Sequence, residues 1–242
     1  MKAERGAPGK LYLLPNLLGA VEPASVLPAR TLAIARRLRH FVVETPKAAR
    51  AFVKSLPSEH ALRDIAFAEL NEHTPAHAVA ALLAPVLAGE DVALLSDAGC
   101  PGVADPGAPL VAAAHRAGVT VVPLVGPSAL LLALMASGMS GQHFVFHGYL
   151  PVRAEARAAA LKALDAAVAK SGATQLFIET PYRNEAMVAA VLAVCRPRTL
   201  FCVAVDLSLP SEQVLSRTVE QWSGAPGLRL AGRPAMFLLG SD

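Results

Sequence analysis

Short apolar runs alternate with longer alanine-rich segments over most of the 242-residue chain. The short runs have the composition of buried strands, and the longer segments have the length and apolar spacing of helices. This alternation predicts βαβ units, in which helices connect parallel strands. In the first half we expect strands at 10–14, 40–43, 65–68, 92–95 and 119–123, and helices at 29–39, 47–54, 76–88 and 109–117. These elements predict a parallel five-stranded sheet with helices.

A second series of helices and strands follows. Helices are expected at 128–137, 154–170 and 183–193, and strands at 144–147, 175–178, 200–205, 214–219 and 235–239. We therefore predict an α/β fold with two lobes and a mixed sheet in the second lobe. The N-terminal domain is expected at 10–124 and the C-terminal domain at 125–242, with the boundary inside 120–152.

Residues 117–152 form a stretch of 36 residues without Lys, Arg, Asp or Glu. A membrane-spanning helix needs about 20 consecutive apolar residues. Because Pro123, Gly126, Pro127 and Gly138 interrupt the stretch, we predict no membrane span. The N-terminal sequence MKAERGAPGK lacks the apolar segment of a secretory signal, which favours a cytoplasmic protein.

Charge is distributed unevenly along the chain. Residues 1–57 carry ten Lys or Arg and three Glu, a net charge of +7, whereas the remainder carries twelve Lys or Arg and sixteen Asp or Glu, a net charge of −4. A basic segment of this kind suits a polyanion such as RNA. The alternative is a helix face that is basic only because it is solvated.

Two loops rich in glycine and proline follow predicted strands, where ligands bind in open α/β sheets. Residues 96–107 hold three Gly and two Asp, which allow a close approach of the backbone and hydrogen bonds to a ribose or an amino group. A tight turn capped by Asp is the structural alternative. Residues 123–129 lead into a helix for which Ser128 is a suitable N-cap. Neither G-x-G-x-x-G after the first strand nor a P-loop motif is present.

Four motifs in this order resemble the tetrapyrrole (corrin/porphyrin) methylase superfamily: S-D-A-G-C-P-G-V-A-D-P-G, V-V-P-L-V-G-P, G-Y-L-P and E-T-P-Y-R. The similarity extends from Leu11 to Leu239 and is greatest to the branch that 2'-O-methylates a cytidine of 16S ribosomal RNA. The resemblance implies a methyltransferase that uses S-adenosylmethionine (SAM). It also implies that SAM binds in a cleft between the two lobes and that the protein is a homodimer.

The resemblance assigns residues to the cofactor site. Those implied to contact SAM are Pro15, Ser96, Asp97, Ala98, Gly99, Val103, Ala104, Ser128, Ala129, Ile178, Pro234, Ala235 and Met236. An apolar site with backbone hydrogen bonds and few charges also suits a cationic sulfonium with an adenosine tail.

Methyl transfer from a sulfonium is an in-line displacement, for which positioning supplies much of the rate. A base is needed only if the acceptor must lose a proton. Glu44, Asp105 and Glu179 are the candidate bases, and for each the alternative role is a cap or an ion pair. Substrate contacts are expected from Lys47, Tyr182 and Arg183.

The chain departs from the RNA-methylating branch at positions that face the acceptor. Val-Glu-Thr-Pro at 43–46 stands where that branch has E-D-T-R, Ala20 stands where it has Asn, and residues 204–209 lack two of its cations. The leading prediction is an RNA or ribosomal-subunit substrate. A tetrapyrrole or another small molecule is the second prediction, and a nonenzymatic paralogue that binds SAM or RNA is the third.

No metal is expected. His73 and His77 have the spacing H-x-x-x-H, but Pro75 lies between them and no third ligand is evident. The three cysteines form no C-x-x-C pair and predict buried thiols rather than disulfides. Trp222 is expected to pack in the core.

Overall fold

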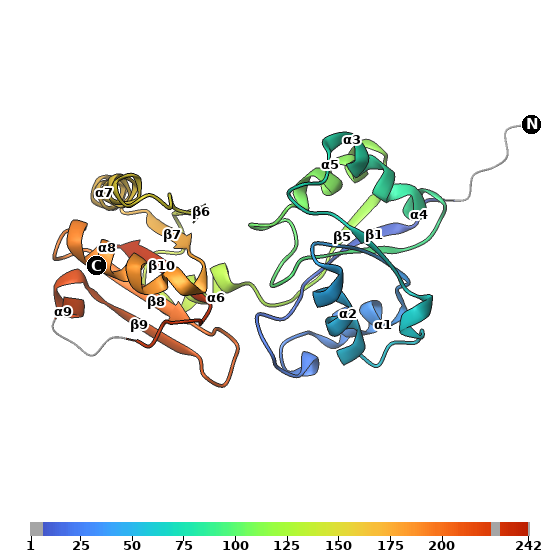
Figure 1. The fold of residues 1–242 in the computed structure, drawn as a ribbon, viewed down its shortest axis with the longest axis horizontal. Coiled ribbons are helices and arrows are strands. Elements are labelled where there is room, and N and C mark those ends of the chain that lie inside the picture. The colour runs from blue at the N-terminus through green and yellow to red at the C-terminus, as the bar shows by residue number, and fades with distance from the viewer. Residues whose placement is uncertain (1–6, 224–227, 242) are drawn as a thin grey trace, which may run out of the picture. The chain divides into compact units, whose positions relative to one another are not determined.

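A computed structural model describes residues 7–223 and 228–241 of the chain (Figure 1). The chain divides into two compact units, and the division lies between Ser128 and Ala129. Each unit has one five-stranded sheet with helices, so the predicted α/β class with a parallel and a mixed sheet is confirmed. The domain limits of 10–124 and 125–242 stay a prediction.

The sheet of the N-terminal unit has the order β3-β2-β4-β1-β5, and every neighbouring pair is parallel, as predicted. Its strands are β1 (Lys10–Leu14), β2 (His40–Val43), β3 (Ala66–Glu69), β4 (Val92–Leu95) and β5 (Thr120–Pro123). All four residues of β4, the central strand, are buried. This burial explains why the sequence of β4 is continuously apolar instead of alternating.

Helices cover both faces of this sheet, and successive strand residues point to opposite cores. Tyr12 packs in the core under α1 (Ala29–Arg37) and α2 (Pro46–Ser55). Leu11 packs on the other face, under α3 (Ala76–Val79), α4 (Ala84–Leu87) and α5 (Ala108–Arg116). Figure 1 shows these two helical layers on either side of the sheet.

The single helix predicted at 76–88 is wrong, because the structure breaks it into α3, a 3₁₀ turn at Ala80–Leu83 and α4. Pro85 lies in the first turn of α4. Proline has no N–H, and its ring collides with the carbonyl group four residues earlier, so an α-helix cannot run through it unchanged. Two further 3₁₀ turns, Pro23–Ser25 and Leu62–Asp64, were not predicted.

The C-terminal unit has a mixed sheet in the order β6-β7-β10-β8-β9. Only β6 and β7 are parallel, and the other three neighbouring pairs are antiparallel. The strands are β6 (Phe144–Tyr149), β7 (Thr174–Ile178), β8 (Leu200–Val205), β9 (Gln213–Thr218) and β10 (Ala235–Gly240).

One face of this sheet contacts α6 (Ala129–Ser137), which touches β8, β9 and β10. The other face carries the main core of the unit, formed with α7 (Ala154–Ser171) and α8 (Asn184–Val194). Two short helical segments, Pro181–Arg183 and α9 (Val219–Ser223), were not predicted. Trp222 is buried, and its Nε1 donates to the Phe201 carbonyl at 2.7 Å, which confirms the predicted packing role.

No helix in 7–223 or 228–241 is long and apolar enough to cross a membrane. The uncharged residues 117–152 are divided among β5, α6 and β6. Cys195 and Cys202 are buried free thiols, and Cys100 is half-buried and free.

Candidate functional site

The topology of the N-terminal sheet places a switch point between β1 and β4, which are neighbours. After β1 the chain goes to α1 on one face, and after β4 it goes to α5 on the other face. The two loops therefore diverge at the carboxyl ends of adjacent strands. Open α/β sheets bind ligands at such a point.

Asn16 joins these two loops. Its Nδ2 donates to the carbonyl oxygens of Ser96 at 3.0 Å and Asp97 at 3.1 Å, and its backbone N–H donates to the Gly99 carbonyl at 2.9 Å. The side chain is buried, and its Oδ1 accepts from the backbone N–H of Leu17. Asn16 thus fixes the loop after β1 against the loop after β4.

The loop at 96–107 owes its shape to its own polar groups. Ser96 is buried and donates through Oγ to the carbonyls of Ala98 and Gly99. Gly99, Gly102 and Ala104 have φ values of +69°, +85° and +59°. Glycine enters this left-handed region without the steric cost that Ala104 incurs. A non-glycine residue held there is characteristic of functional loops.

Asp105 braces the same loop. Its Oδ1 accepts from the Gly107 N–H at 2.7 Å, and its Oδ2 accepts from the Gly102 N–H at 2.8 Å. Burial raises the pKa of this carboxyl group, and the backbone hydrogen bonds oppose the shift. Because both oxygens are engaged by backbone groups, the geometry favours the alternative role that the sequence left open, that of a turn cap.

Asp97 connects the loop to the start of α2. Its Oδ2 accepts from Thr45 Oγ1 at 2.6 Å, and its Oδ1 accepts from the Thr45 N–H at 3.1 Å. The adjacent Glu44 Oε2 accepts from the Asp97 N–H at 3.4 Å. The ends of β2 and β4 are thereby tied together by polar contacts.

Glu44 is the half-buried carboxylate of this group. Burial raises the pKa of Glu44, the hydrogen bond from Asp97 opposes the shift, and the charges of Asp97, Asp105 and Glu72 raise the pKa further. Like-charged carboxylates around one point favour a cationic ligand, which would relieve their repulsion.

A third loop packs onto the first. A Cβ added to Gly126 would lie 2.4 Å from Pro15 Cβ, so only glycine allows this approach. Thr31 Oγ1 donates to the Val125 carbonyl at 2.8 Å, and Cys100 Sγ lies 3.5 Å from the Pro127 carbonyl. The structure therefore brings Pro15, residues 96–99 and the segment before Ser128 to one end of the sheet.

Other predicted residues lie in the C-terminal unit. Ile178, at the end of β7, is the antiparallel partner of Met236 in β10. Ala235 pairs with Val205, and the Pro234 carbonyl accepts from the Asp206 N–H at 3.0 Å. Ile178, Pro234, Ala235 and Met236 are thus neighbours, while Ala129 begins α6.

Glu179 is buried and paired with Arg183. Its Oε1 accepts from Arg183 Nη2 at 2.6 Å and Nε at 3.0 Å, and also from the Thr180 N–H at 2.7 Å. Its Oε2 is buried and has no hydrogen-bond partner within the described residues. This arrangement favours an ion pair over catalysis.

The predicted substrate contacts are placed as follows. Lys47 is exposed in the first turn of α2. Tyr182 is 76% exposed, and the Arg183 guanidinium lies 5.3 Å from its ring centroid. Because Arg183 is held by Glu179, Tyr182 is the member of this pair that presents the larger free surface.

Two residues with defined roles, Asn16 and Thr45, were missing from the predicted site. Asn16 lies two residues after the end of β1, and Thr45 lies two residues after the end of β2. Side chains just after the carboxyl ends of strands often bind ligands, so this position in the sequence could have identified both residues. No group of three or more His, Cys, Asp or Glu suited to a metal ion occurs in the described part of the chain.

Comparisons with known proteins agree with this architecture. The family described as Tetrapyrrole (Corrin/Porphyrin) Methylases matches residues 19–222. A Ribosomal RNA small subunit methyltransferase I of Micromonospora olivasterospora is 36% identical over 214 residues, which are 88% of this chain and 64% of that protein. The protein of the same name in Escherichia coli O157:H7 is 30% identical over 223 residues, 90% of this chain and 69% of that protein.

The fold also matches solved structures. A uroporphyrin-III C-methyl transferase from Thermus thermophilus, complexed with S-adenyl homocysteine, aligns with a TM-score of 0.55 and 20% sequence identity. The alignment covers 96% of this chain and 97% of that chain. At this identity the likeness concerns the fold alone.

Proposed function

The chain belongs to the tetrapyrrole (corrin/porphyrin) methylase family, and from this premise we propose that it is a SAM-dependent methyltransferase whose acceptor is RNA. The observation that carries the proposal is the polar junction at the switch point of the N-terminal sheet. There Asn16, Asp97 and Glu44 hold together the loops to which the family resemblance assigns the cofactor. The assignments of the base and of the acceptor, given below, depend on this site.

The residues at this junction fit SAM chemically. The loop at 96–107 exposes Ala98, Val103 and Ala104, while its buried groups keep it in shape. The carboxylates near Glu44 complement the positive charge of a sulfonium or an ammonium group. We assign to the cofactor site the thirteen residues named from the resemblance, with Asn16 as a positioning residue. SAM, when bound, supplies the electrophilic methyl group.

The protein's own contribution is to orient the acceptor and to handle one proton. An RNA 2'-hydroxyl loses its proton as the new C–O bond forms, so a base near the reacting oxygen accelerates the step. Of the three candidates, Asp105 and Glu179 are engaged by strong donors, whereas Glu44 has only a 3.4 Å contact. We therefore assign the base to Glu44, whose raised pKa increases its affinity for a proton.

RNA is favoured over a tetrapyrrole as the acceptor. The relatives that share 30% and 36% identity over about nine-tenths of the chain carry the name of a ribosomal RNA methyltransferase. The chain spans 64% of the length of the first of them, so the rest of that protein has no counterpart in this alignment. The net charge of +7 over residues 1–57 supports a polyanionic acceptor independently.

We also propose a homodimer that works in the cytoplasm, where ribosomal RNA is modified. The exposed apolar side chains of the edge strand β6 and of α6 support a second copy as the partner. Phe144, Val145 and Tyr149 are 37%, 40% and 58% exposed, and Met135 is 78% exposed. Large apolar side chains left exposed on an edge strand or a helix can mark an interaction surface. Analytical ultracentrifugation tests the dimer, and a monomer at all concentrations would refute it.

The activity is tested with labelled cofactor and RNA. Tritiated SAM is incubated with the protein and with total RNA from a strain that lacks the gene or from its parent. We expect label only in RNA from the deletion strain, since the parental sites are already methylated. Equal labelling of both RNAs, or of neither, contradicts an RNA acceptor, and absence of SAM binding in isothermal titration contradicts the enzyme altogether.

A further inference from the structure

A basic groove lies between α1 and the edge of the N-terminal sheet. It has a volume of about 360 Å³, and Lys10, Arg30 and Arg37 line it together with Tyr12, Ile34 and Val122. We call it the α1 groove. It belongs wholly to the N-terminal unit and contains none of the residues assigned to SAM.

Secondary-structure geometry explains why the cations converge. Arg30, Ile34 and Arg37 recur at helical spacing and so share one face of α1. Lys10 and Tyr12 are two residues apart in β1 and point to the same face of the sheet, where Val122 of β5 is the partner of Tyr12. Charged side chains therefore surround an apolar floor.

Within the part of the chain that the structure describes, few carboxylates neutralise the three cations of the groove, so their charge is available to an anionic ligand. Among the described residues, these three cations make one ion pair: Arg37 Nη2 lies 3.7 Å from Asp91 Oδ2, on the surface. With one carboxylate against three cations, the groove has a net charge of +2. A 3.7 Å pair whose side chains are 50% and 35% exposed contributes little and yields readily to a phosphate.

Arg37 is already oriented. Its Nη2 donates to the Tyr12 hydroxyl at 3.0 Å, and its guanidinium lies 5.9 Å from the centroid of the Tyr12 ring. A guanidinium held in this manner loses less freedom when it binds a phosphate. Arg30 lies two helical turns away, about 10.5 Å along the helix axis. This backbone separation suits two phosphates better than one.

We propose that the α1 groove binds successive phosphates of the RNA backbone, with Arg37 and Lys10 at one phosphate and Arg30 at another. The spacing of the cations and the apolar floor, which suits ribose, favour a chain of phosphates over a single anion. The inference rests on the proposed function, because it supplies the RNA that the site at the switch point would methylate. In this proposal, RNA lies beside the amino-terminal half of β1, and the loop assigned to SAM follows the carboxyl end of the same strand.

The test compares two variants of the full chain with equal charge. The groove variant is K10Q/R30Q/R37Q, and the control is K54Q/R63Q/R116Q, three exposed cations of the same unit outside the groove. The probe is a fluorescein-labelled single-stranded RNA titrated at several salt concentrations. At 0.1 M salt, each lost phosphate contact reduces affinity about fivefold, so the groove variant, which loses the contacts to two phosphates, binds about 25-fold more weakly. The slope of log K against log salt becomes shallower by about 1.4.

The control variant is expected to retain the wild-type slope and most of the affinity. Equal losses in both variants would overturn the groove, as would an unchanged groove variant or displacement of the RNA by an equal concentration of inorganic phosphate. Should the triple variant fail to fold, R30Q alone tests the same point, because Arg30 is exposed and its replacement should not disturb the fold. R30Q is expected to lower the affinity for RNA about fivefold. SAM titration separates the two proposals: wild-type protein that binds RNA through the groove but no SAM refutes the enzyme and leaves the groove intact.

Discussion

Asn16 and Ser96 are joined across the switch point of the N-terminal sheet by a hydrogen bond of 3.0 Å from Nδ2 to the carbonyl oxygen. The two residues are 80 positions apart in sequence. Ser96 directly follows β4, and Asn16 lies two residues after the end of β1. Their contact therefore holds together two loops that lead to opposite faces of the sheet. The family resemblance assigns the cofactor to these two loops, and this contact fixes one loop against the other.

Replacing Asn16 with alanine is expected to destabilise the protein by about 1–3 kcal/mol, because the carbonyls of Ser96 and Asp97 lose a donor in a buried place. SAM affinity should fall as well, since the loop at 96–107 loses its link to the loop after β1. Urea denaturation and isothermal titration measure the two effects. Gln142→Ala, an exposed amide outside both loops, serves as the control and should change neither quantity. Unaltered SAM binding in Asn16→Ala would remove Asn16 from the site.

Asp97 can be tested for direct contact with SAM by a pair of variants. Asp97→Ala removes both acceptors of Thr45, and Thr45→Val removes only the donor of the 2.6 Å contact while the carboxylate remains. Both should cost about 0.5–1.5 kcal/mol of stability, the usual contribution of one side-chain hydrogen bond. If Asp97 faces the cofactor, only Asp97→Ala weakens SAM binding tenfold or more. Equal weakening in the two variants would show that Asp97 acts only by fixing α2.

The raised pKa of Glu44 leads us to expect that the stability of the protein changes with pH in a particular direction. Burial raises its pKa above the ordinary value of 4.5, so the folded state holds the proton more tightly than the unfolded state. The stability due to Glu44 is therefore complete below pH 4.5 and is lost as the pH rises through the raised pKa. Glu44→Gln should accordingly be more stable than wild type at pH 7 and equal to it below about pH 4. Urea titrations across this range measure the difference, and a variant less stable at pH 7 would contradict the assignment.

The same variant tests the base. If Glu44 accepts the proton of the acceptor hydroxyl, Glu44→Gln lowers the rate of methyl transfer by about 10²–10⁴ while the folded protein still binds RNA. Asp105→Asn is the matched comparison: it removes the charge and one of the two acceptors of the brace but no base, so its rate should fall much less. Equal losses in the two variants would argue that neither carboxylate is the base.

The strands of the N-terminal sheet were predictable because each is a short, largely apolar run, and a parallel sheet covered on both faces requires such runs. The loops at the carboxyl ends were predictable for a similar reason, since Gly and Asp gather there. The contacts that give those loops their roles were not. Asn16 finds its partners 80 and 81 residues later, and no local pattern encodes that pairing.

The break between α3 and α4 is a different kind of error. Pro85 was visible in the sequence and its effect on a helix is local, so the rule for proline was sufficient to predict it. Apolar periodicity across 76–88 outweighed it in the prediction. The roles of Glu179 and Asp105 lie between these cases: an ion pair or a cap was foreseen for each, but only the structure identifies Arg183 and the two glycine N–H groups as the donors.

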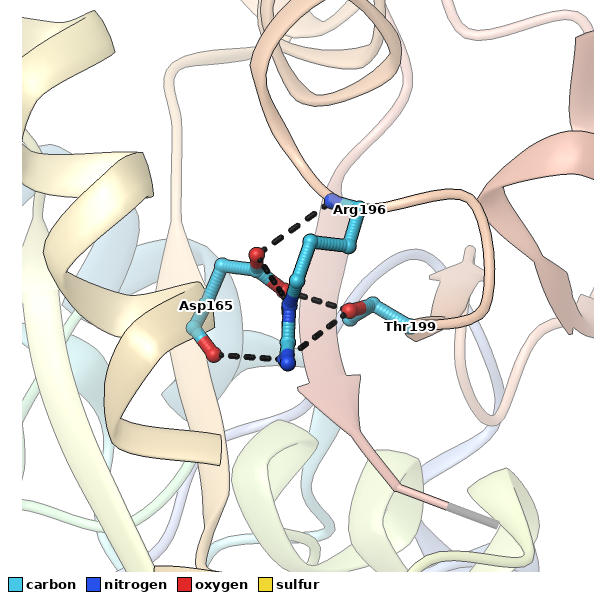
Figure 2. Close-up of polar contacts among 3 residues, drawn as sticks. All are labelled: Asp165, Arg196 and Thr199. Atoms are coloured by element: carbon cyan, nitrogen blue, oxygen red, sulfur yellow. Dashed lines mark hydrogen bonds and ion pairs between the residues drawn. The ribbon is translucent and has the colours of Figure 1, made fainter. Parts of the chain in front are cut away.

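In the C-terminal unit, Asp165 of α7 holds the segment after α8 through Arg196 and Thr199 (Figure 2). Arg196 Nε donates to Asp165 Oδ2 at 2.8 Å, and Arg196 Nη2 donates to the Asp165 carbonyl at 2.9 Å. Thr199 Oγ1 donates to Asp165 Oδ1. Burial alone would raise the pKa of Asp165, but the hydrogen bonds from Arg196 and Thr199 outweigh it and lower the pKa.

Asp165→Asn is therefore expected to destabilise the protein by about 2 kcal/mol at pH 7, a figure kept low because the Arg196 side chain is 51% exposed. A lowered folded pKa contributes stability above the unfolded value of 3.8, and this contribution is lost as the pH falls through the folded pKa. The difference between variant and wild type should shrink below pH 3.8 accordingly. Asp64→Asn, whose exposed pair with Arg63 is 3.8 Å long, should cost at most about 0.5 kcal/mol at any pH. Urea denaturation of the three proteins at several pH values decides the matter: a constant difference for Asp165→Asn across the range would mean that packing of the side chain, and not its charge, stabilises this part of the unit.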